Sequence, residues 1–380
     1  MDESFSFDQK KAGWMRFIPA LSFAVILVTG FVVTLMSLRD VPEKKWSGMD
    51  NIHRLLNGES TRQFTNQLNT HFLLSKPFAK IERGITWAIA GDTGVSVRTG
   101  CPDWFFLADE LTPYDDAENN ASARDHIVVQ VAELLKKRGI KLVMAVVPDK
   151  SRIEKSHLCG LHRPAKFDRR IDDWIAPLRA KQIEVIDLRA PLQQLEGERY
   201  YRSDSHWNEH GANAAAQAIA QRLQELQLVD KPAAAPQASA IQSRVVDRSG
   251  DLMRVANLEG LPAWLRPSVE KTQLSVVAPV TVASDDLFGD AGLPSVVLVG
   301  TSFTRASNFV PFLSHYLGAP VANMAKDGGD FEGAAMTYLS GKTYQQEPPK
   351  VLLWEVPERM LQKTLTPSEH LWLTYLAKAK

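Results

Sequence analysis

The sequence has no excess of charge of either sign. Its 44 lysines and arginines equal its 44 aspartates and glutamates, which gives a formal net charge of zero. Nothing in this balance indicates a strongly basic surface for nucleic acid, or one that captures a polyanion by charge alone. We therefore expect no nucleic-acid partner, and local residues would have to bind any charged substrate.

The sequence also lacks the paired Cys/His clusters of a zinc site. It has two cysteines, Cys101 and Cys159. The run from His157 to His162, with Cys159 inside it, invites a metal interpretation, but no second cluster with zinc spacing accompanies it. We expect neither a metal nor another cofactor.

One long run lacks charge altogether. Residues 17–38 contain no charged side chain, and at ~1.5 Å per residue they can cross a bilayer core of ~30 Å. The run exceeds the ~7 to 15 apolar residues of a signal peptide, and no Ala-x-Ala cleavage site follows it. We expect an uncleaved transmembrane anchor at 17–38 behind a tail at 1–16. Basic residues on both sides leave its orientation open.

The rest of the chain divides into a linker and one domain. Residues 39–92 carry scattered apolar residues at helical spacing, so we expect a membrane-proximal helical linker. We expect a single catalytic domain at 93–380, since no internal repeat is apparent. A Pro/Ala-rich stretch at 231–240 opens an insertion in it at 230–294.

Five short apolar runs predict the fold class. They are rich in β-branched residues and alternate with helix-like stretches, which is typical of a three-layer α/β domain. We expect one parallel five-stranded sheet, with strands at 141–147, 184–188, 295–299, 320–324 and 350–356.

Ser302 stands where such a fold places catalytic groups. It follows the strand-like run 295–299 and Gly300, and it precedes a helix-like segment. Its hydroxyl is therefore expected at the carboxyl end of the sheet, with its backbone N–H directed toward a developing oxyanion. Gly-Thr-Ser after a strand is common in α/β proteins, so this motif alone is weak.

Asp204 and His206 strengthen the interpretation. They lie two residues apart, so on an extended loop their side chains leave the same side and the carboxylate can orient the imidazole. An Ala-rich helical run follows at 208–223. With Ser302 as the nucleophile, the three residues form a split Ser-His-Asp triad.

These elements resemble the SGNH (GDSL-like) esterases and acyltransferases. Ordinary members begin with the serine strand and end with the Asp/His loop, whereas this chain has the reverse order, as if circularly permuted. That order, with Asp-x-His in place of Asp-x-x-His, is similar to the alginate O-acetyltransferase (AlgJ/AlgX) family. The segments that carry the resemblance are 100–110, 147–153, 202–207, 300–302 and 354–359.

The resemblance implies a function and a location. It implies ping-pong transfer of an acetyl group through Ser302 to a secreted polysaccharide, above all alginate at mannuronate O2 or O3. It also implies a single-pass protein of the bacterial inner membrane with its catalytic domain in the periplasm. The partners would be a membrane-bound O-acyltransferase that delivers acetyl and other exopolysaccharide acetylation and secretion proteins.

Three alternatives stay open at this point. Water in place of the sugar hydroxyl would make the chain a carbohydrate acetylesterase, and a triad alone does not separate the two activities. Another polymer, such as cellulose, could replace alginate. A non-catalytic scaffold is the third alternative, and the intact triad argues against it.

The residues that bind substrate are predicted less directly. The Gly-x-Asn-Asp motif of ordinary esterases is absent, so a second oxyanion donor would come from Asn323 or from the backbone of Gly328 or Gly329.

Two arginines and a tryptophan lie near the catalytic residues in sequence. Arg305 follows Ser302 by one turn, and Arg202 and Trp207 flank the Asp/His loop. These residues could pair with a uronate carboxylate or stack on a sugar ring of the substrate. For each arginine the alternative is an ordinary surface ion pair.

The two cysteines also have two interpretations. Both lie in the part expected to be exported, where a disulfide between Cys101 and Cys159 would close a loop of about sixty residues and stabilise the fold by ~4 kcal/mol. Free buried thiols are the alternative.

Overall fold

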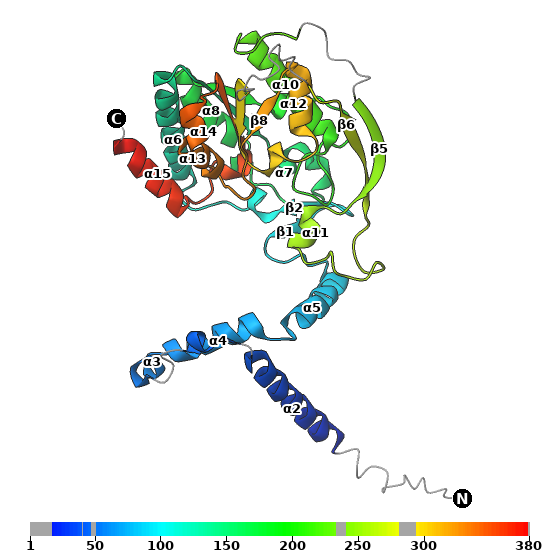
Figure 1. The fold of residues 1–380 in the computed structure, drawn as a ribbon. Coiled ribbons are helices and arrows are strands. Elements are labelled where there is room, and N and C mark those ends of the chain that lie inside the picture. Colours follow the sequence, from blue (N-terminus) through cyan, green and yellow to red (C-terminus); the bar gives the residue numbers. More distant parts are fainter. Residues whose placement is uncertain (1–16, 40, 47–50, 233–240, 281–293, 379–380) are drawn as a thin grey trace, which may run out of the picture. The chain divides into compact units, whose positions relative to one another are not determined.

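The computed structural model describes residues 17–39, 41–46, 51–232, 241–280 and 294–378, in two compact units, Met1–Thr86 and Trp87–Lys380 (Figure 1). The expected tail at 1–16 and residues 233–240 of the Pro/Ala-rich stretch lie outside the described residues. So does the end of the expected insertion, residues 281–293.

The first unit is helical. Its longest helix, α2, contains the uncharged run and is, within the described ranges, the one helix long and apolar enough to cross a membrane. Its side chains are mostly exposed, unlike those of a core helix. The elements of this unit are α2 (Ile18–Arg39), η1 (Glu43–Trp46), α3 (Ile52–Leu56), α4 (Glu59–His71) and α5 (Ser75–Ala90), whose last residues belong to the second unit.

The second unit is built on one parallel sheet. Its strand order is β4-β3-β9-β7-β8, and every neighbouring pair is parallel. The five apolar runs became these five strands, which confirms the expected α/β fold. The strands are β3 (Lys141–Val147), β4 (Glu184–Asp187), β7 (Val296–Val299), β8 (Val321–Asn323) and β9 (Val351–Pro357).

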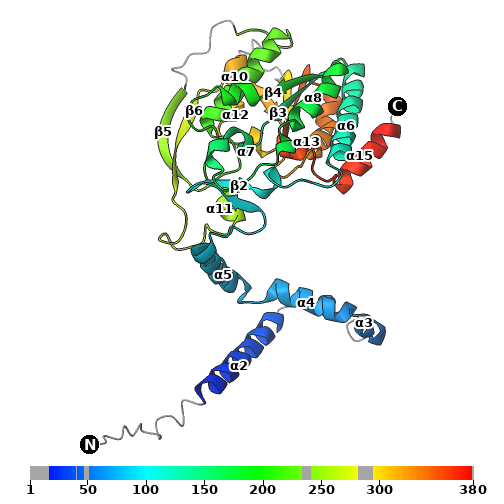
Figure 2. The same ribbon diagram turned by 180° about the vertical axis from the view of Figure 1, so that it is seen from behind.

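Helices cover both faces of this sheet. Alternate strand residues point to opposite sides, so Trp354 packs into one core with Trp174 and Trp372, while Leu353 packs into another with Phe312. Figures 1 and 2 show the first layer, α6, α8, α13, α14 and α15, and the opposite layer with α10 and α12. The helices are α6 (Ala117–Lys137), α7 (Lys150–Ile153), α8 (Arg170–Ala180), α9 (Arg189–Gln193), α10 (Glu209–Glu225), α12 (Phe309–Leu317), α13 (Gly333–Leu339), α14 (Lys342–Gln346) and α15 (Pro367–Lys378).

Two antiparallel pairs lie outside the central sheet. One pairs β1 (Val97–Thr99) with β2 (Phe105–Leu107), and the other pairs β5 (Ile241–Arg248) with β6 (Glu270–Val277). Strands β5 and β6 are mostly exposed and polar, so no apolar run predicted them. This ribbon and the short helix α11 (Asp251–Val255) belong to the expected insertion, and they bring residues to the active site.

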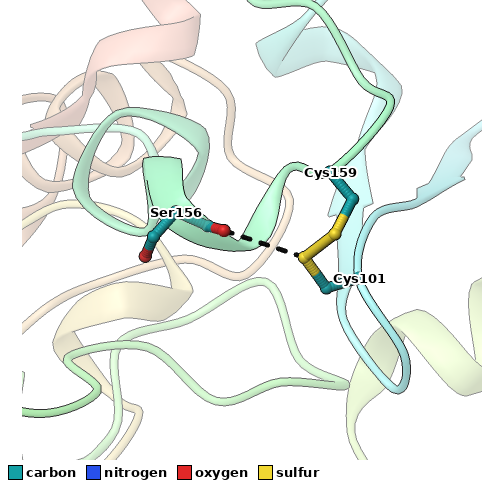
Figure 3. The surroundings of a disulfide bond; sticks show 3 residues. All are labelled: Cys101, Ser156 and Cys159. Carbon is teal, nitrogen blue, oxygen red and sulfur yellow. Dashed lines mark hydrogen bonds between the residues drawn. A yellow bond between two sulfur atoms is a disulfide. The ribbon is translucent and has the colours of Figure 1, made fainter.

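A disulfide joins Cys101 to Cys159 across 58 positions of the chain (Figure 3). The sulfur of Cys101 also lies 3.7 Å from the carbonyl oxygen of Ser156. The bridge fastens the β1–β2 turn to the loop that follows α7. The structure thus contains the bonded form of the two cysteines rather than the free thiols.

Candidate active site

A tight turn after β7 holds Ser302. A Cβ added to Gly300 would lie 2.5 Å from a carboxylate oxygen of Glu355 and 2.8 Å from its Cβ, so only glycine fits there. The Glu355 carboxylate accepts hydrogen bonds from the Thr301 N–H at 2.6 Å and from its hydroxyl at 3.0 Å. These contacts fix the turn, and Ser302 begins a short 3₁₀ helix at the carboxyl end of the sheet.

The Asp/His loop meets Ser302 at this edge. The Nδ1 atom of His206 lies 2.6 Å from Oδ1 of Asp204, and its Nε2 lies 2.7 Å from the Ser302 hydroxyl. The His206 backbone N–H also donates to Asp204 at 3.0 Å, which holds the carboxylate against its own loop. The three side chains therefore form a continuous hydrogen-bonded chain with the geometry of a Ser-His-Asp triad.

Arg248 holds the other oxygen of the triad carboxylate. Its guanidinium donates to Oδ2 of Asp204 at 2.7 Å and lies over the ring of Tyr201, 4.2 Å from the centroid. Burial raises the pKa of Asp204, but hydrogen bonds and charge from His206 and Arg248 outweigh it and hold that pKa well below its usual range. Asp204 is therefore ionised at neutral pH.

A second carboxylate, Asp251, lies close to the same imidazole. Its Oδ2 is 3.7 Å from Nδ1 of His206 and accepts from the Ser205 hydroxyl at 2.6 Å, while its Oδ1 accepts from the Ser205 N–H at 2.7 Å. Ligand atoms of Asp204, His206 and Asp251 lie close enough together to hold a metal ion. Each of them already has a hydrogen-bonding partner, however, so we assign the cluster to the triad.

A pocket of about 310 Å³ opens over the triad. Its lining mixes charges of both signs and comes from the Asp/His loop, the Ser302 turn, the insertion and the loop after β8. Arg248, Arg254 and Arg305 supply three cations, and Asp204, Asp251, Glu259 and Asp327 supply four carboxylates. The pocket offers polar and ionic partners rather than an apolar surface, which suits a hydrophilic substrate.

Comparison with known proteins identifies the family. Residues 97–358, about two thirds of the chain, match the model described as "SGNH hydrolase-like domain, acetyltransferase AlgX". The chain belongs to the AlgX family.

Individual AlgX-family relatives agree with this assignment. The probable alginate O-acetylase AlgJ of Pseudomonas aeruginosa is 31% identical over 322 residues, 81% of either chain. The alginate biosynthesis protein AlgX of Pseudomonas syringae is 30% identical over 67% of this chain and 53% of that protein. The solved O-acetyltransferase domain of Pseudomonas putida AlgJ is 28% identical and superposes with a TM-score of 0.63, covering 75% of this chain and 99% of that one.

One predicted substrate contact in this AlgX-family chain is wrong. Trp207 is fully buried and packs between Phe303 and Phe309, with ring centroids 5.1 and 5.0 Å away. It cannot present a face to a sugar ring. Trp207 pairs with Tyr200 in an isolated antiparallel bridge at the end of the loop, and its side chain belongs to the core below it.

The two predicted arginines have different positions. Arg305 lines the pocket, with a half-exposed side chain 3.7 Å from the carboxylate of Asp327. Arg202 does not line it, because its guanidinium lies 4.0 Å from the carboxylates of Glu198 and Glu270. Arg305 remains a candidate for binding substrate in this AlgX-family site, whereas Arg202 is a structural residue of the loop.

None of the three residues predicted for the second oxyanion donor, Asn323, Gly328 and Gly329, lines the pocket. The side-chain oxygen of Asn323 accepts from the Ala325 N–H at 3.0 Å, and the Gly329 N–H donates to Lys326 at 3.1 Å. In contrast, the described part of the chain has no acceptor paired with the Ser302 N–H, so this donor is available at the nucleophile itself.

Lys150 holds the backbone of the Asp/His loop through hydrogen bonds. It is not among the residues predicted from the sequence. It is fully buried, and its Nζ donates to the carbonyls of Asp204 and Arg202 at 2.9 Å and of Phe105 at 2.5 Å. Burial lowers its pKa to about 8, and the charge of Glu110 opposes this shift. The Pro-Asp-Lys-Ser sequence after β3 was the one available indication, whereas nothing in the sequence indicated Arg248.

We expect Lys150→Met to lower the free energy of unfolding by about 3 kcal/mol, because three carbonyls lose their donor inside the protein. The measurement is urea denaturation of both proteins. The matched control is Lys155→Met, since Lys155 is exposed and lies five residues away. Equal stability of the two variants would contradict this supporting role.

Glu355 is expected to make stability depend on pH. Burial raises its pKa from 4.5 to about 7, while hydrogen bonds from Thr301 oppose the shift. Between these values the folded protein keeps a proton that the unfolded chain has lost, so stability falls as the pH rises. We expect Glu355→Gln to remove this fall, on the order of 3 kcal/mol.

The measurement for Glu355 is the midpoint of urea unfolding between pH 4.5 and 7. The exposed Glu133 provides the control, because Glu133→Gln should keep the slope of the unmodified protein. If stability falls equally with pH in the unmodified protein and in Glu355→Gln, the Glu355 carboxyl has the same pKa in the folded and unfolded chains, which contradicts the prediction.

Proposed function

We propose that this protein is an O-acetyltransferase that acetylates a secreted polysaccharide through an acetyl-Ser302 intermediate. The observation that carries the proposal is the hydrogen-bonded chain from Asp204 through His206 to Ser302, 2.6 and 2.7 Å long at its two contacts. Its setting at the carboxyl end of the sheet in an AlgX-family domain supports acyl transfer.

The first half-reaction acylates the enzyme. The Ser302 hydroxyl attacks the acetyl carbonyl of the donor while Nε2 of His206 takes its proton. The Ser302 N–H donates to the oxygen that becomes negative. The carbonyl then re-forms, the donor's leaving group departs with the proton from His206, and an acetyl ester remains on Ser302.

The second half-reaction reverses these roles. A sugar hydroxyl gives its proton to His206 and attacks the acetyl-Ser302 carbonyl, and the serine oxygen leaves with that proton. Asp204 remains ionised throughout and stabilises the imidazolium that forms twice. Water in place of the sugar would give hydrolysis, so the pocket must favour the sugar.

For the acceptor we propose alginate, acetylated at mannuronate O2 or O3. Its uronate carboxylates could pair with Arg305 and Arg254, which line the pocket beside Ser302. The names of the AlgJ and AlgX relatives support this polymer, since they describe those proteins as acting in alginate acetylation or biosynthesis.

We further propose that the protein is anchored in the inner membrane. Helix α2 would span the bilayer, with the tail 1–16 in the cytoplasm, a helical linker at 39–92 and the catalytic domain 93–380 in the periplasm. The Cys101–Cys159 disulfide is typical of such an oxidising compartment. A membrane-bound O-acyltransferase would deliver acetyl, alongside other polysaccharide acetylation and secretion proteins.

Mass spectrometry tests the acetyl transfer. The purified protein is exposed briefly to an activated acetyl ester, with and without mannuronate oligomers. We expect an acetyl group on the Ser302 peptide that moves to the oligomer when oligomer is present. Acetyl lost only to water, at a rate that the oligomer does not change, would make the protein an esterase instead.

A further inference from the structure

Helix α5 carries an apolar stripe that no described residue covers. Phe78, Ile81, Ile85 and Ile89 follow one another at intervals of three and four residues, so they share one face of the helix. Their exposed fractions are 57%, 57%, 53% and 82%. A row of four large apolar side chains is seldom left exposed to solvent, and such a patch usually marks an interaction site.

The opposite face of α5 is polar and partly occupied. Helical spacing places Lys80 and Arg83 there, together with Trp87. The Trp87 indole N–H donates to the Leu265 carbonyl at 2.7 Å, and its ring lies 6.0 Å from that of Phe105. Trp87, the first residue of the second unit, is therefore held by that unit, whereas the four side chains of the stripe are exposed.

The start of α5 lies beside the end of the membrane-spanning helix. The Leu73 N–H, two residues before α5, donates to the Ser37 hydroxyl at 3.0 Å. Ser37 is buried near the carboxyl end of α2, which finishes at Arg39. If α2 crosses the bilayer, this contact fixes the first turn of α5 at the membrane surface.

Helix α5 cannot itself cross a bilayer. Its 16 residues are about 24 Å long at ~1.5 Å per residue, shorter than a core of ~30 Å. It also contains the charged residues Lys80, Glu82 and Arg83. Lys80 and Arg83 lie on the face opposite the stripe, whereas Glu82, four residues after Phe78 and three before Ile85, lies at the edge of the stripe. A short helix with an apolar stripe and a cationic opposite face instead suits the plane of the interface.

We propose that α5 lies along the surface of the membrane that α2 crosses, with Phe78, Ile81, Ile85 and Ile89 inserted among the lipid acyl chains. The helix continues past Thr86 into the catalytic unit without a break. The catalytic unit would thus be tethered at the bilayer by two elements. The proposal rests on the proposed anchoring by α2 and not on the proposed chemistry.

Single-cysteine labelling of the full chain tests the proposal. The two native cysteines are joined to each other, so an introduced cysteine is the one reactive thiol. Ile85→Cys probes the stripe, Ile81→Cys repeats the probe at a second position, and Lys80→Cys is the control on the opposite face. Val28→Cys reports on α2. Each variant is labelled with a small fluorophore and reconstituted in phosphatidylethanolamine/phosphatidylglycerol vesicles.

The readouts are quenching by nitroxide-labelled lipids and by aqueous iodide. We expect the labels at positions 85 and 81 to be quenched at least threefold more by the lipids than the label at 80, and less by iodide. If lipids quench the Val28→Cys label but neither stripe label, the interfacial helix is wrong while the anchor stands. Stripe labels protected from both quenchers would mean that protein covers the face, which also overturns the proposal. An unquenched label at 28 would overturn the anchor, and the proposal with it.

Discussion

Replacement of Ser302 by alanine is expected to abolish acetyl transfer, with a fall in rate of at least about a thousandfold. The reason is that Ser302 supplies the oxygen to which the acetyl group becomes attached, and His206 has no other hydroxyl at its Nε2 atom in the described structure. The variant should still fold, because the Ser302 side chain is only partly buried and its loss leaves no cavity in the core.

For Ser302→Ala we would measure two rates: the rate at which an activated ester loses its acetyl group, and the rate at which mannuronate oligomers gain it. Thermal unfolding run in parallel separates lost chemistry from lost folding. Ser314→Ala is the matched control, since Ser314 lies in α12 after the catalytic turn and away from the pocket. A Ser302→Ala protein that still acetylates oligomers would remove this serine from the mechanism.

Asp204→Asn is expected to have the second largest effect, a fall of about a thousandfold or more. An asparagine amide can donate to Nδ1 of His206, which would leave the imidazole in the wrong tautomer. It would also leave the Arg248 guanidinium without its carboxylate. Asp251→Asn should cost about tenfold or less, because its oxygen is 3.7 Å from Nδ1 whereas that of Asp204 is 2.6 Å.

Steady-state kinetics of the two asparagine variants checks this difference. Both substitutions keep the volume of the side chain, but Asp204→Asn also removes a partly buried ion pair with Arg248. Thermal unfolding run in parallel therefore separates lost chemistry from lost stability. Similar losses in both variants, together with inactivation by a chelator, would indicate that Asp204, His206 and Asp251 hold a metal ion instead. Such a result would replace the triad mechanism with a metal-assisted one.

The sequence predicts the sheet and the candidate triad because both depend on local patterns. The three inner strands β3, β7 and β9 are buried and apolar almost throughout, so their runs could be located without knowledge of their neighbours. The edge strands β4 and β8 are partly exposed. Asp204 and His206 are two residues apart, and Ser302 directly follows a strand. Their meeting needed only the rule that catalytic groups gather where parallel strands end.

The surroundings of the triad depend on contacts across long stretches of chain. Arg248 reaches Asp204 from a strand of the insertion 44 positions away, and Lys150 reaches the same loop from the end of β3 across 54 positions. Such pairings leave no periodic pattern in the sequence. Burial of Trp207 was likewise invisible, because an aromatic side chain beside a catalytic residue fits a core and a sugar-binding surface equally well.

The sequence by itself determined the elements: an apolar helix long enough to cross a membrane, five parallel strands, and a serine, a histidine and an aspartate expected at the edge where such strands end. Tertiary structure alone decided which side chains surround them. Side-chain burial and hydrogen bonding are set by the packing of distant segments, and periodicity reports only the face that a residue presents within its own helix or strand. For this reason the triad was predicted, whereas its supporting residues Arg248, Lys150 and Glu355 emerged from the fold.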